Sequence, residues 1–429
     1  MFKKLYHRLR DEVLSWRDGD PIDNIVTMCW NLHYFSIPMR DLHLKLHYNT
    51  KRRATSILIM MLSLVSAVRF FSLALMPLPS PEYDIIVGSV QHTLGSLGKV
   101  MNLVMGFFSL ESFIIRGVFI VQEDSGNMFY MAVYMTNTLV NDPNSGRTKK
   151  FLQTNFFEGK KTLIKLLSLV VSWHLMTCFI RISDEVSDQV SNQHPLQRSL
   201  FWILWTFFNI GISFVAVVDY ISVPMLRSIN GGSQATRQIT LLEEATTLVF
   251  GKAHSSWQTE ELVQTQYHSF IEKYCELKSY MSASTKVYGM FVFPHNFCST
   301  FINGSLIFGV IHVSNNWFLL PIIASLAYLC VNQIWIIMTK TAKVTETSLK
   351  IYRVLCSLPN RRSNTYLTLK QRRVMQEITK CLGGDRAPIA VKGVEGRIYN
   401  SEAVFENISS TISLVIQFLE LTRDIRTQE

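Results

Sequence analysis

The residues best placed to do chemistry lie in the last apolar stretch of the chain, between residues 399 and 421. At 100° per residue, one face of a helix here carries the polar side chains of Glu402, Glu406, Ser410, Ser413 and Gln417. A membrane-spanning helix with one polar stripe must keep that stripe away from lipid. We favour a stripe that lines a water-filled pore. Close packing against another helix, which small serines also suit, is the alternative.

Other ionisable and aromatic side chains fall inside or at the outer ends of earlier apolar stretches. Five of them are candidates for contact with a small-molecule ligand: Arg69, His92, Trp202, Trp205 and Trp317. Each has a plainer explanation: a snorkelling or ion-paired arginine, a hydrogen-bonded core histidine, or tryptophans of the membrane interface. Arg116 could simply mark the inner end of the second span. Buried tryptophans such as Trp173 or Trp335 are candidates for absorbing ultraviolet light.

Catalytic and metal-binding patterns are not evident. The chain has no Gly-x-Ser-x-Gly, no phosphate-binding loop and no Glu-x-x-His. His43 and His47 have a spacing that suits a metal, but two ligands alone do not make a site. We therefore expect neither an enzyme nor a cofactor or metal centre.

The composition is that of a membrane protein. Of 429 residues, 48% are apolar and only 17% are charged, against about 25% in an ordinary soluble domain. The net charge of +10 is typical of basic cytoplasmic loops and does not require a nucleic-acid partner. We expect an all-α, multi-pass protein of the plasma membrane, whose seven spans begin and end near 54–78, 85–120, 163–182, 200–226, 287–313, 317–339 and 399–421.

The basic residues predict the orientation of these spans. Segments on one side of the membrane carry 35 Lys and Arg, and those on the other side carry four. The positive-inside rule then puts the N-terminus in the cytoplasm and the C-terminus outside, the reverse of a G-protein-coupled receptor. A transporter is a further alternative, although we find no internal symmetry between the two halves.

This orientation divides the chain into a cytoplasmic N-terminal segment, spans with long helical extensions, and a short extracellular tail. The expected boundaries are 1–53 for the N-terminal segment, 54–340 for spans one to six with cytoplasmic extensions at 121–162 and 227–286, 341–398 for a cytoplasmic linker and anchor helix, 399–421 for the pore-lining span, and 422–429 for the tail. Helical spacing of apolar residues along 259–284 and 366–382 predicts amphipathic helices. We expect these helices to form a packed cytoplasmic layer that joins subunits. The alternative is that they are solvated amphipathic helices that pack on the membrane face.

The segment STISLVIQF, which begins at Ser410, resembles the signature of the insect gustatory receptors. That signature is Thr-Tyr, five hydrophobic residues and Gln-Phe, in the last span just before the C-terminus. Gln417 and Phe418 match it. Ser410 and Thr411 stand where the family has Thr and Tyr, and Ser413 interrupts the hydrophobic run. The departures resemble a divergent member, such as the nematode gustatory-receptor-like proteins, some of which sense light or hydrogen peroxide.

The resemblance implies a stimulus-gated, non-selective cation channel made of four subunits, identical or different. The last helices would line one central pore, with Gln417 and Phe418 near its outer gate, and a tastant would bind among the earlier spans. In such a tetramer Glu402 and Glu406 become rings of carboxylates that attract cations. Alternatively, these two acids pair with nearby basic residues or mark the start of the helix. A light or peroxide sensor on the same scaffold is the alternative function.

Overall fold

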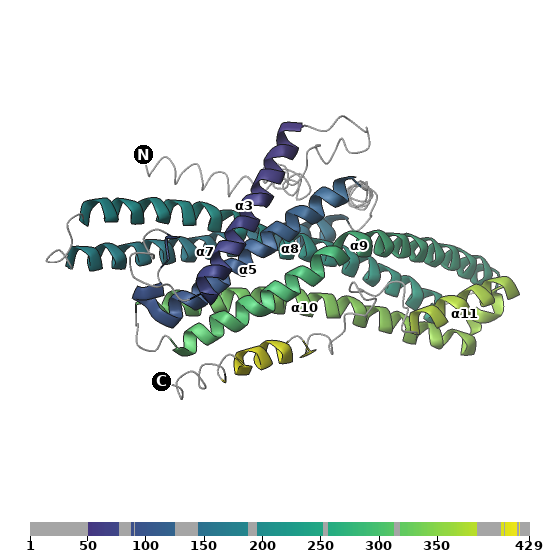
Figure 1. Ribbon diagram of the computed structural model, residues 1–429. Coiled ribbons are helices and arrows are strands. Elements are labelled where there is room, and N and C mark those ends of the chain that lie inside the picture. Colours follow the sequence, from purple (N-terminus) through teal and green to yellow (C-terminus); the bar gives the residue numbers. More distant parts are fainter. Residues whose placement is uncertain are drawn as a thin grey trace.

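The computed structural model describes residues 50–76, 87–89, 91–124, 145–187, 195–251, 256–312 and 318–383, together with 405–406, 408–417 and 420. All regular structure in these ranges is helical, with no strand, which confirms the all-α fold for this part of the chain (Figure 1). The main helices are α3 (Thr50–Leu75), α5 (Gln91–Asp124), α7 (Ser145–Ser187), α8 (Pro195–Phe250), α9 (Ser256–His312), α10 (Leu320–Cys356) and α11 (Leu369–Gly383).

Four of the described helices are long and apolar enough to cross a bilayer. They are Thr50–Leu75, Leu94–Val121, Glu158–Ser183 and Arg198–Ser222, and they coincide with the first four predicted spans. The remaining three predicted spans fall on the second half of α9, on α10 with its shorter apolar stretch Leu320–Gln333, and on the terminal helix Ile408–Gln417. The total of seven and the orientation of the termini stay predictions.

The outer surface of the bundle is apolar, while small polar residues lie inside. On α3, Leu58 and Val65 are 60% and 63% exposed, whereas Ser63 and Ser66 are buried. Phe207 of α8 is 70% exposed. A soluble protein would place these residues the other way round. Lipid tails can solvate exposed leucine and phenylalanine, and small residues let helices approach closely, so this surface is that of a membrane protein.

The described residues form two separate hydrophobic cores. The first lies within the bundle, among α3, α5, α7, α8, α9 and α10. The second, which we call the distal layer, joins the end of α8, the start of α9, the end of α10 and α11. Three long helices, α8, α9 and α10, therefore take part in both cores, and Figure 1 shows them running past the bundle toward α11.

The distal layer buries the apolar face that the helical spacing along 259–284 picks out. Phe270, Tyr274 and Leu277 of α9 are all buried there. Burial raises the pKa of Tyr274 to about 12, because the buried site disfavours the charged phenolate. An amide pair, in which Gln371 Nε2 of α11 donates to Gln264 Oε1 of α9 at 2.6 Å, ties the rim of the layer together.

Candidate functional site

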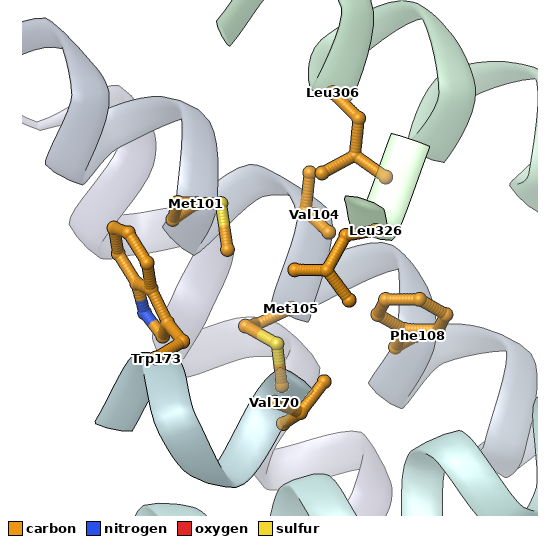
Figure 2. Close-up of a pocket in the computed structure, with 8 residues that line it drawn as sticks. All are labelled: Met101, Val104, Met105, Phe108, Val170, Trp173, Leu306 and Leu326. Carbon is orange, nitrogen blue, oxygen red and sulfur yellow. The ribbon is translucent and has the colours of Figure 1, made fainter. Parts of the chain in front are cut away.

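The bundle encloses an apolar cavity between α5, α7, α9 and α10 (Figure 2). Four of its side chains come from α5 at the spacing of one helical face, two from α7, and one each from α9 and α10. The lining residues are Met101, Val104, Met105, Phe108, Val170, Trp173, Leu306 and Leu326. The cavity therefore lies where four helices of the bundle meet, and all of its walls are apolar or aromatic.

The cavity is tight in this structure. Its volume is about 10 Å³, which is hardly the room that one water molecule needs. Ligand pockets commonly measure about 300–1,000 Å³. Met101 and Met105 have flexible thioether side chains that change shape easily. Entry of a small apolar molecule therefore requires these side chains to change rotamer.

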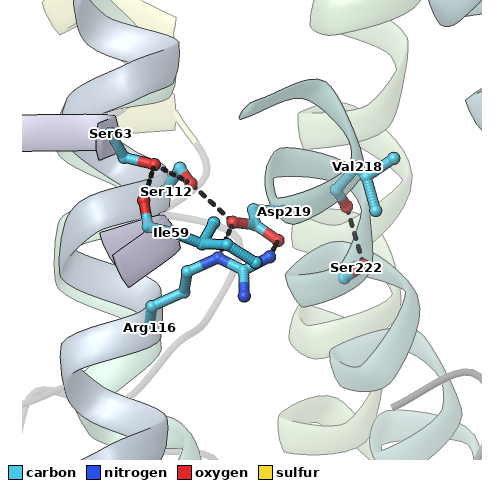
Figure 3. A network of polar contacts seen from close by, with 7 residues as sticks. All are labelled: Ile59, Ser63, Ser112, Arg116, Val218, Asp219 and Ser222. Atoms are coloured by element: carbon cyan, nitrogen blue, oxygen red, sulfur yellow. Dashed lines mark hydrogen bonds and ion pairs between the residues drawn. The ribbon is translucent and has the colours of Figure 1, made fainter. Parts of the chain in front are cut away.

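Beside the cavity, a buried ion pair joins α5 to α8 (Figure 3). Arg116 donates to both carboxylate oxygens of Asp219, with Nε–Oδ2 and Nη2–Oδ1 distances of 2.7 and 2.9 Å. Ser112 donates to Asp219 Oδ2 at 2.5 Å and contacts Ser63 of α3 at 3.0 Å. Asp219 is fully buried, and Arg116 is 2% exposed. The interpretation of Arg116 as a marker of the helix end is therefore wrong, because the side chain turns inward to an acidic partner.

A second buried acidic residue, Glu111 of α5, contacts α9. Glu111 Oε1 lies 2.5 Å from Nδ1 of His295, and both side chains are buried. A further buried histidine, His174 of α7, contacts Ser213 of α8 through Nε2 at 2.8 Å, as expected for a hydrogen-bonded core histidine. The bundle therefore contains polar contacts that join α3, α5, α7, α8 and α9 in pairs.

Arg69 holds the short piece of chain that precedes α5. Its Nη2 donates to the carbonyl oxygens of Val87 and Gly88 at 2.6 and 3.2 Å, and its Nη1 donates to Asn209 of α8 at 2.9 Å. The guanidinium lies 4.4 Å from the ring centre of Trp205. Arg69 is therefore a structural clamp between α3, α8 and residues 87–89.

A second arginine and tryptophan hold the same short segment, residues 87–89. Arg181 of α7 donates to the carbonyl oxygen of Ser89 at 3.3 Å and lies 4.8 Å from the ring centre of Trp202. Trp202 is only 3% exposed. Its interpretation as part of a lipid-facing aromatic belt is therefore wrong, because an arginine covers its ring inside the protein.

The structure separates most of the predicted ligand contacts from the cavity. Arg69, Trp202 and Trp205 serve the two clamps, and none of them lines the cavity. Trp317 and the side chain of His92 lie outside the described residues. Of the two tryptophans considered for light absorption, Trp173 lines the cavity, whereas Trp335 is 51% exposed and so is not buried in the chain.

The terminal helix packs on α9 through Leu414, which lies over Gly304. A Cβ atom added to Gly304 would come within 2.8 Å of Leu414 Cδ2. Val415 is buried, whereas Ser410, Ser413 and Gln417 are exposed on this chain.

The rest of the predicted gate is only partly described. Glu406 is exposed, and its backbone carbonyl accepts a hydrogen bond of 2.8 Å from the Ser410 hydroxyl. Glu402 and Phe418 lie outside the described residues. The apolar face of the helix, opposite the polar stripe, is only partly buried, because Phe405 and Ile412 are exposed. The described part of the helix therefore presents a mixed polar and apolar surface away from α9.

The sequence interpretation missed the cavity and both buried acidic residues. Met101 and Met105 look like ordinary core residues, so nothing in their spacing distinguishes them. Glu111 and Asp219 did carry a signal, because an acidic residue inside an apolar stretch needs a partner. Arg116 lies in the same apolar stretch as Glu111 and is a basic residue that can pair with a buried acidic residue.

The comparisons with known proteins identify a fold. No protein-family model matches the sequence, and no curated protein matches it. The structure is similar to the insect olfactory receptor OR5 from Machilis hrabei in complex with eugenol, with a TM-score of 0.63 and 15% sequence identity over 93% of this chain and 97% of that one. A second structure of OR5 gives a TM-score of 0.60 and 13% identity over 97% and 99% of the two chains. At these identities the likeness is one of fold, and it extends over nearly the whole length of both proteins.

Proposed function

We propose that this chain is a subunit of a chemosensory receptor, similar to the gustatory receptors, that acts as a stimulus-gated, non-selective cation channel. The observation that carries the proposal is the likeness to an insect olfactory receptor over more than nine-tenths of the chain. The C-terminal Gln417-Phe418 pair supports it independently, because it comes from the sequence alone. On this proposal the chain is a receptor of the plasma membrane and not an enzyme.

The stimulus on this proposal is a small, largely apolar molecule that binds in the cavity. Every wall of the cavity is apolar or aromatic, and Trp173 and Phe108 offer rings for stacking. The similar structure of OR5 is in complex with eugenol, a small aromatic molecule. Because the cavity is tight, ligand entry would displace Met101 or Met105 and shift α5 relative to α7 and α10.

The pore on this proposal is formed by the terminal helices of four chains. The exposed side chains of the terminal helix on the single chain include Ser410, Ser413 and Gln417. In an assembly of four chains these side chains can face a central pore. Glu402 and Glu406 would form rings of carboxylates at the cytoplasmic entrance, and Phe418 would narrow the outer end. The distal layer, with its contacts between α8, α9, α10 and α11, would hold neighbouring subunits together.

A light sensor on the same scaffold is the second candidate. The observation that favours it is the position of Trp173, which is 3% exposed and lines the cavity. A buried indole beside a flexible cavity can couple excitation to a movement of its neighbours. The hydrogen peroxide and transporter alternatives have no comparable feature in the described residues.

Current recording separates these candidates. Cells that express this chain alone should be exposed to a panel of small aromatic, aliphatic and sugar compounds, then to ultraviolet light, and then to hydrogen peroxide. The proposal predicts a cation current with at least one compound, and a Trp173→Phe variant that still responds to it. A response to light alone, lost in Trp173→Phe, would favour the second candidate. Silence under every stimulus, with the protein present at the cell surface, would contradict a channel made of this chain alone.

A further inference from the structure

The pair formed by Glu111 and His295 has no role in the cavity or in the terminal helix. The two side chains are 0% and 1% exposed and meet at 2.5 Å between Glu111 Oε1 and His295 Nδ1. They come from α5 and α9, which pack against each other along the bundle. Ionised groups inside a membrane-spanning bundle are costly, so a buried acid there calls for an explanation.

The charges around the pair do not balance without an additional proton. Arg116 is already paired with Asp219, because it donates to both of its carboxylate oxygens. Asp219 also lies near enough to Glu111 for the two carboxyl groups to interact electrostatically. Among the described residues, one guanidinium therefore faces two carboxylates, and a neutral His295 would leave one negative charge uncompensated in a medium that solvates charge poorly.

We propose that Glu111 and His295 form a proton-binding site at the contact of α5 and α9. One proton, shared between Glu111 Oε1 and His295 Nδ1, makes the cluster electrically neutral. The total charge is the same whether the proton resides on the imidazole or on the carboxyl. No covalent bond between heavy atoms changes; the proton comes from water and returns to water.

Each side chain of the pair has a second polar atom outside the Oε1–Nδ1 contact, and these two atoms support a path for that proton. Glu111 Oε2 and His295 Nε2 are buried and have no hydrogen-bond partner among the described residues. Buried polar atoms without a protein partner are commonly satisfied by an internal water molecule. Two unsatisfied atoms, one on each member of the pair, leave capacity for a water molecule that delivers or removes the proton.

Apart from Arg116 and Asp219, the described groups that face the pair, which include the Cys298 thiol near Glu111, do not supply a charge. Tyr220 of α8 stands with its ring centre 5.3 Å from that of His295, and Tyr220 in turn lies next to Ser299 of α9 and Cys330 of α10. A phenol, a hydroxyl and a thiol are neutral near pH 7. The described residues also contain no group of three His, Cys, Asp or Glu side chains that could hold a metal ion, which favours a proton over a metal.

The position of the site gives it a mechanical consequence. His295 follows Pro294, a proline inside α9, where the helix lacks one backbone hydrogen bond. Glu111 lies one turn from Phe108, which lines the cavity. Loss of the proton would leave a buried negative charge between two helices, so α5 and α9 would move apart or admit water. Proton occupancy therefore bears on both the helix around Pro294 and the wall of the cavity.

The site predicts the direction in which the stability of the protein changes with pH. Above about pH 6.5 a free histidine and a free glutamate have both lost their protons, whereas the folded site keeps one. Because the folded protein then binds more protons than the unfolded chain, its stability must fall as pH rises. The unfolding equilibrium constant should rise up to tenfold per pH unit until the folded site also releases its proton.

Thermal unfolding of the purified, detergent-solubilised protein between pH 4 and 9 tests this proposal without reference to channel activity. Wild type should lose thermal stability steadily above pH 6.5. Glu111→Gln keeps the shape and a hydrogen bond to His295 but removes the acid, so its unfolding temperature should be flat above pH 6.5. His174→Gln is the matched control, because His174 is also buried but its ring is hydrogen-bonded to Ser213 and not to an acid, and it should keep the wild-type decline.

A second variant separates the pair from a general alkaline effect. In His295→Gln the buried carboxyl must hold the proton alone, so the decline should begin about two pH units lower, above the ordinary range of glutamate near 4.3. A wild-type profile that is flat above pH 6.5 would overturn the proposal. An equal decline in wild type and Glu111→Gln would also overturn it.

Discussion

Arg69 of α3 places its guanidinium 4.4 Å from the ring centre of Trp205 on α8 and, from that position, donates to the carbonyls of Val87 and Gly88. The contact joins two membrane-spanning helices to the chain segment between α3 and α5. Gly88 has a φ of +64°, which favours glycine. A positively charged residue placed inside the bundle is thus used to fix a backbone turn.

The Gly88 turn should not accept a side chain. A Cβ atom at Gly88 would lie 2.5 Å from Trp205 Cδ2 and 2.9 Å from Nη2 of Arg69. Gly88→Ala should therefore lower the free energy of unfolding by about 1–2 kcal/mol for the positive φ, and by roughly 1–3 kcal/mol more for the steric overlap. The thermal unfolding temperature in detergent measures the effect.

Gly211→Ala on α8 is the control for this substitution. A Cβ atom there meets nothing within 4 Å. Alanine is also favoured over glycine in a helix, so this variant should be neutral or slightly stabilising. Equal stabilities of the two variants would show that the clamp does not confine Gly88.

The buried pair of Arg116 and Asp219 should be intolerant of losing one partner. Asp219→Asn leaves a buried guanidinium without its counter-charge, which costs about 3–5 kcal/mol. The double variant Arg116→Met with Asp219→Leu removes both charges and should recover most of that loss. Unfolding temperatures of the single and double variants give the comparison. A double variant no more stable than Asp219→Asn would mean that the pair contributes more than charge balance.

The sequence predicts the first four spans well because long apolar runs need no knowledge of packing. The same runs show that Arg116, Glu111 and Asp219 are unusual. They do not show which residues pair, because Arg116 and Asp219 are 103 residues apart and meet only through the arrangement of α5 and α8. The cavity is still harder to predict, since Met101 and Leu306 would look the same in a filled core.

Substitutions at the C-terminal end of the terminal helix should change the current through the channel. Phe418→Ala should raise the basal current, because a bulky apolar ring can close a pore by excluding water. Gln417→Ala should change the permeability ratio between cations, because Gln417 lies on the polar stripe with Ser410 and Ser413. Basal current and reversal potentials, at matched surface expression, measure both effects.

Phe207→Ala is the control for these two variants. Phe207 is 70% exposed on α8 and belongs to the apolar outer surface, so its loss should leave both readouts unchanged. If Phe418→Ala and Gln417→Ala behave like Phe207→Ala, the terminal helix does not form the gate.

The predicted orientation of the chain rests on its basic segments. With 35 Lys and Arg on one side and four on the other, a tag after Glu429 should be reached by antibody on intact cells. A tag before Met1 should be reached only after permeabilisation. The reverse labelling pattern would put the last helix in the opposite orientation and remove the proposed positions of Glu406 and Gln417 in the pore.

On the proposed function, a small molecule in the cavity between α5, α7, α9 and α10 opens a cation pore. Val104→Leu adds one methylene group to the cavity wall, whereas Val68→Leu makes the same change on the exposed face of α3. The purified protein should be reconstituted in planar bilayers, and the activating concentration of one ligand should be measured for wild type and both variants.

The proposed function predicts a cation current that the ligand opens, with a several-fold higher activating concentration in Val104→Leu and an unchanged one in Val68→Leu. The added methylene group occupies space that the ligand needs, so it should weaken ligand binding by about 1–3 kcal/mol. Identical dose–response curves in all three proteins, or no ligand-dependent cation current from correctly folded wild type, would contradict the account.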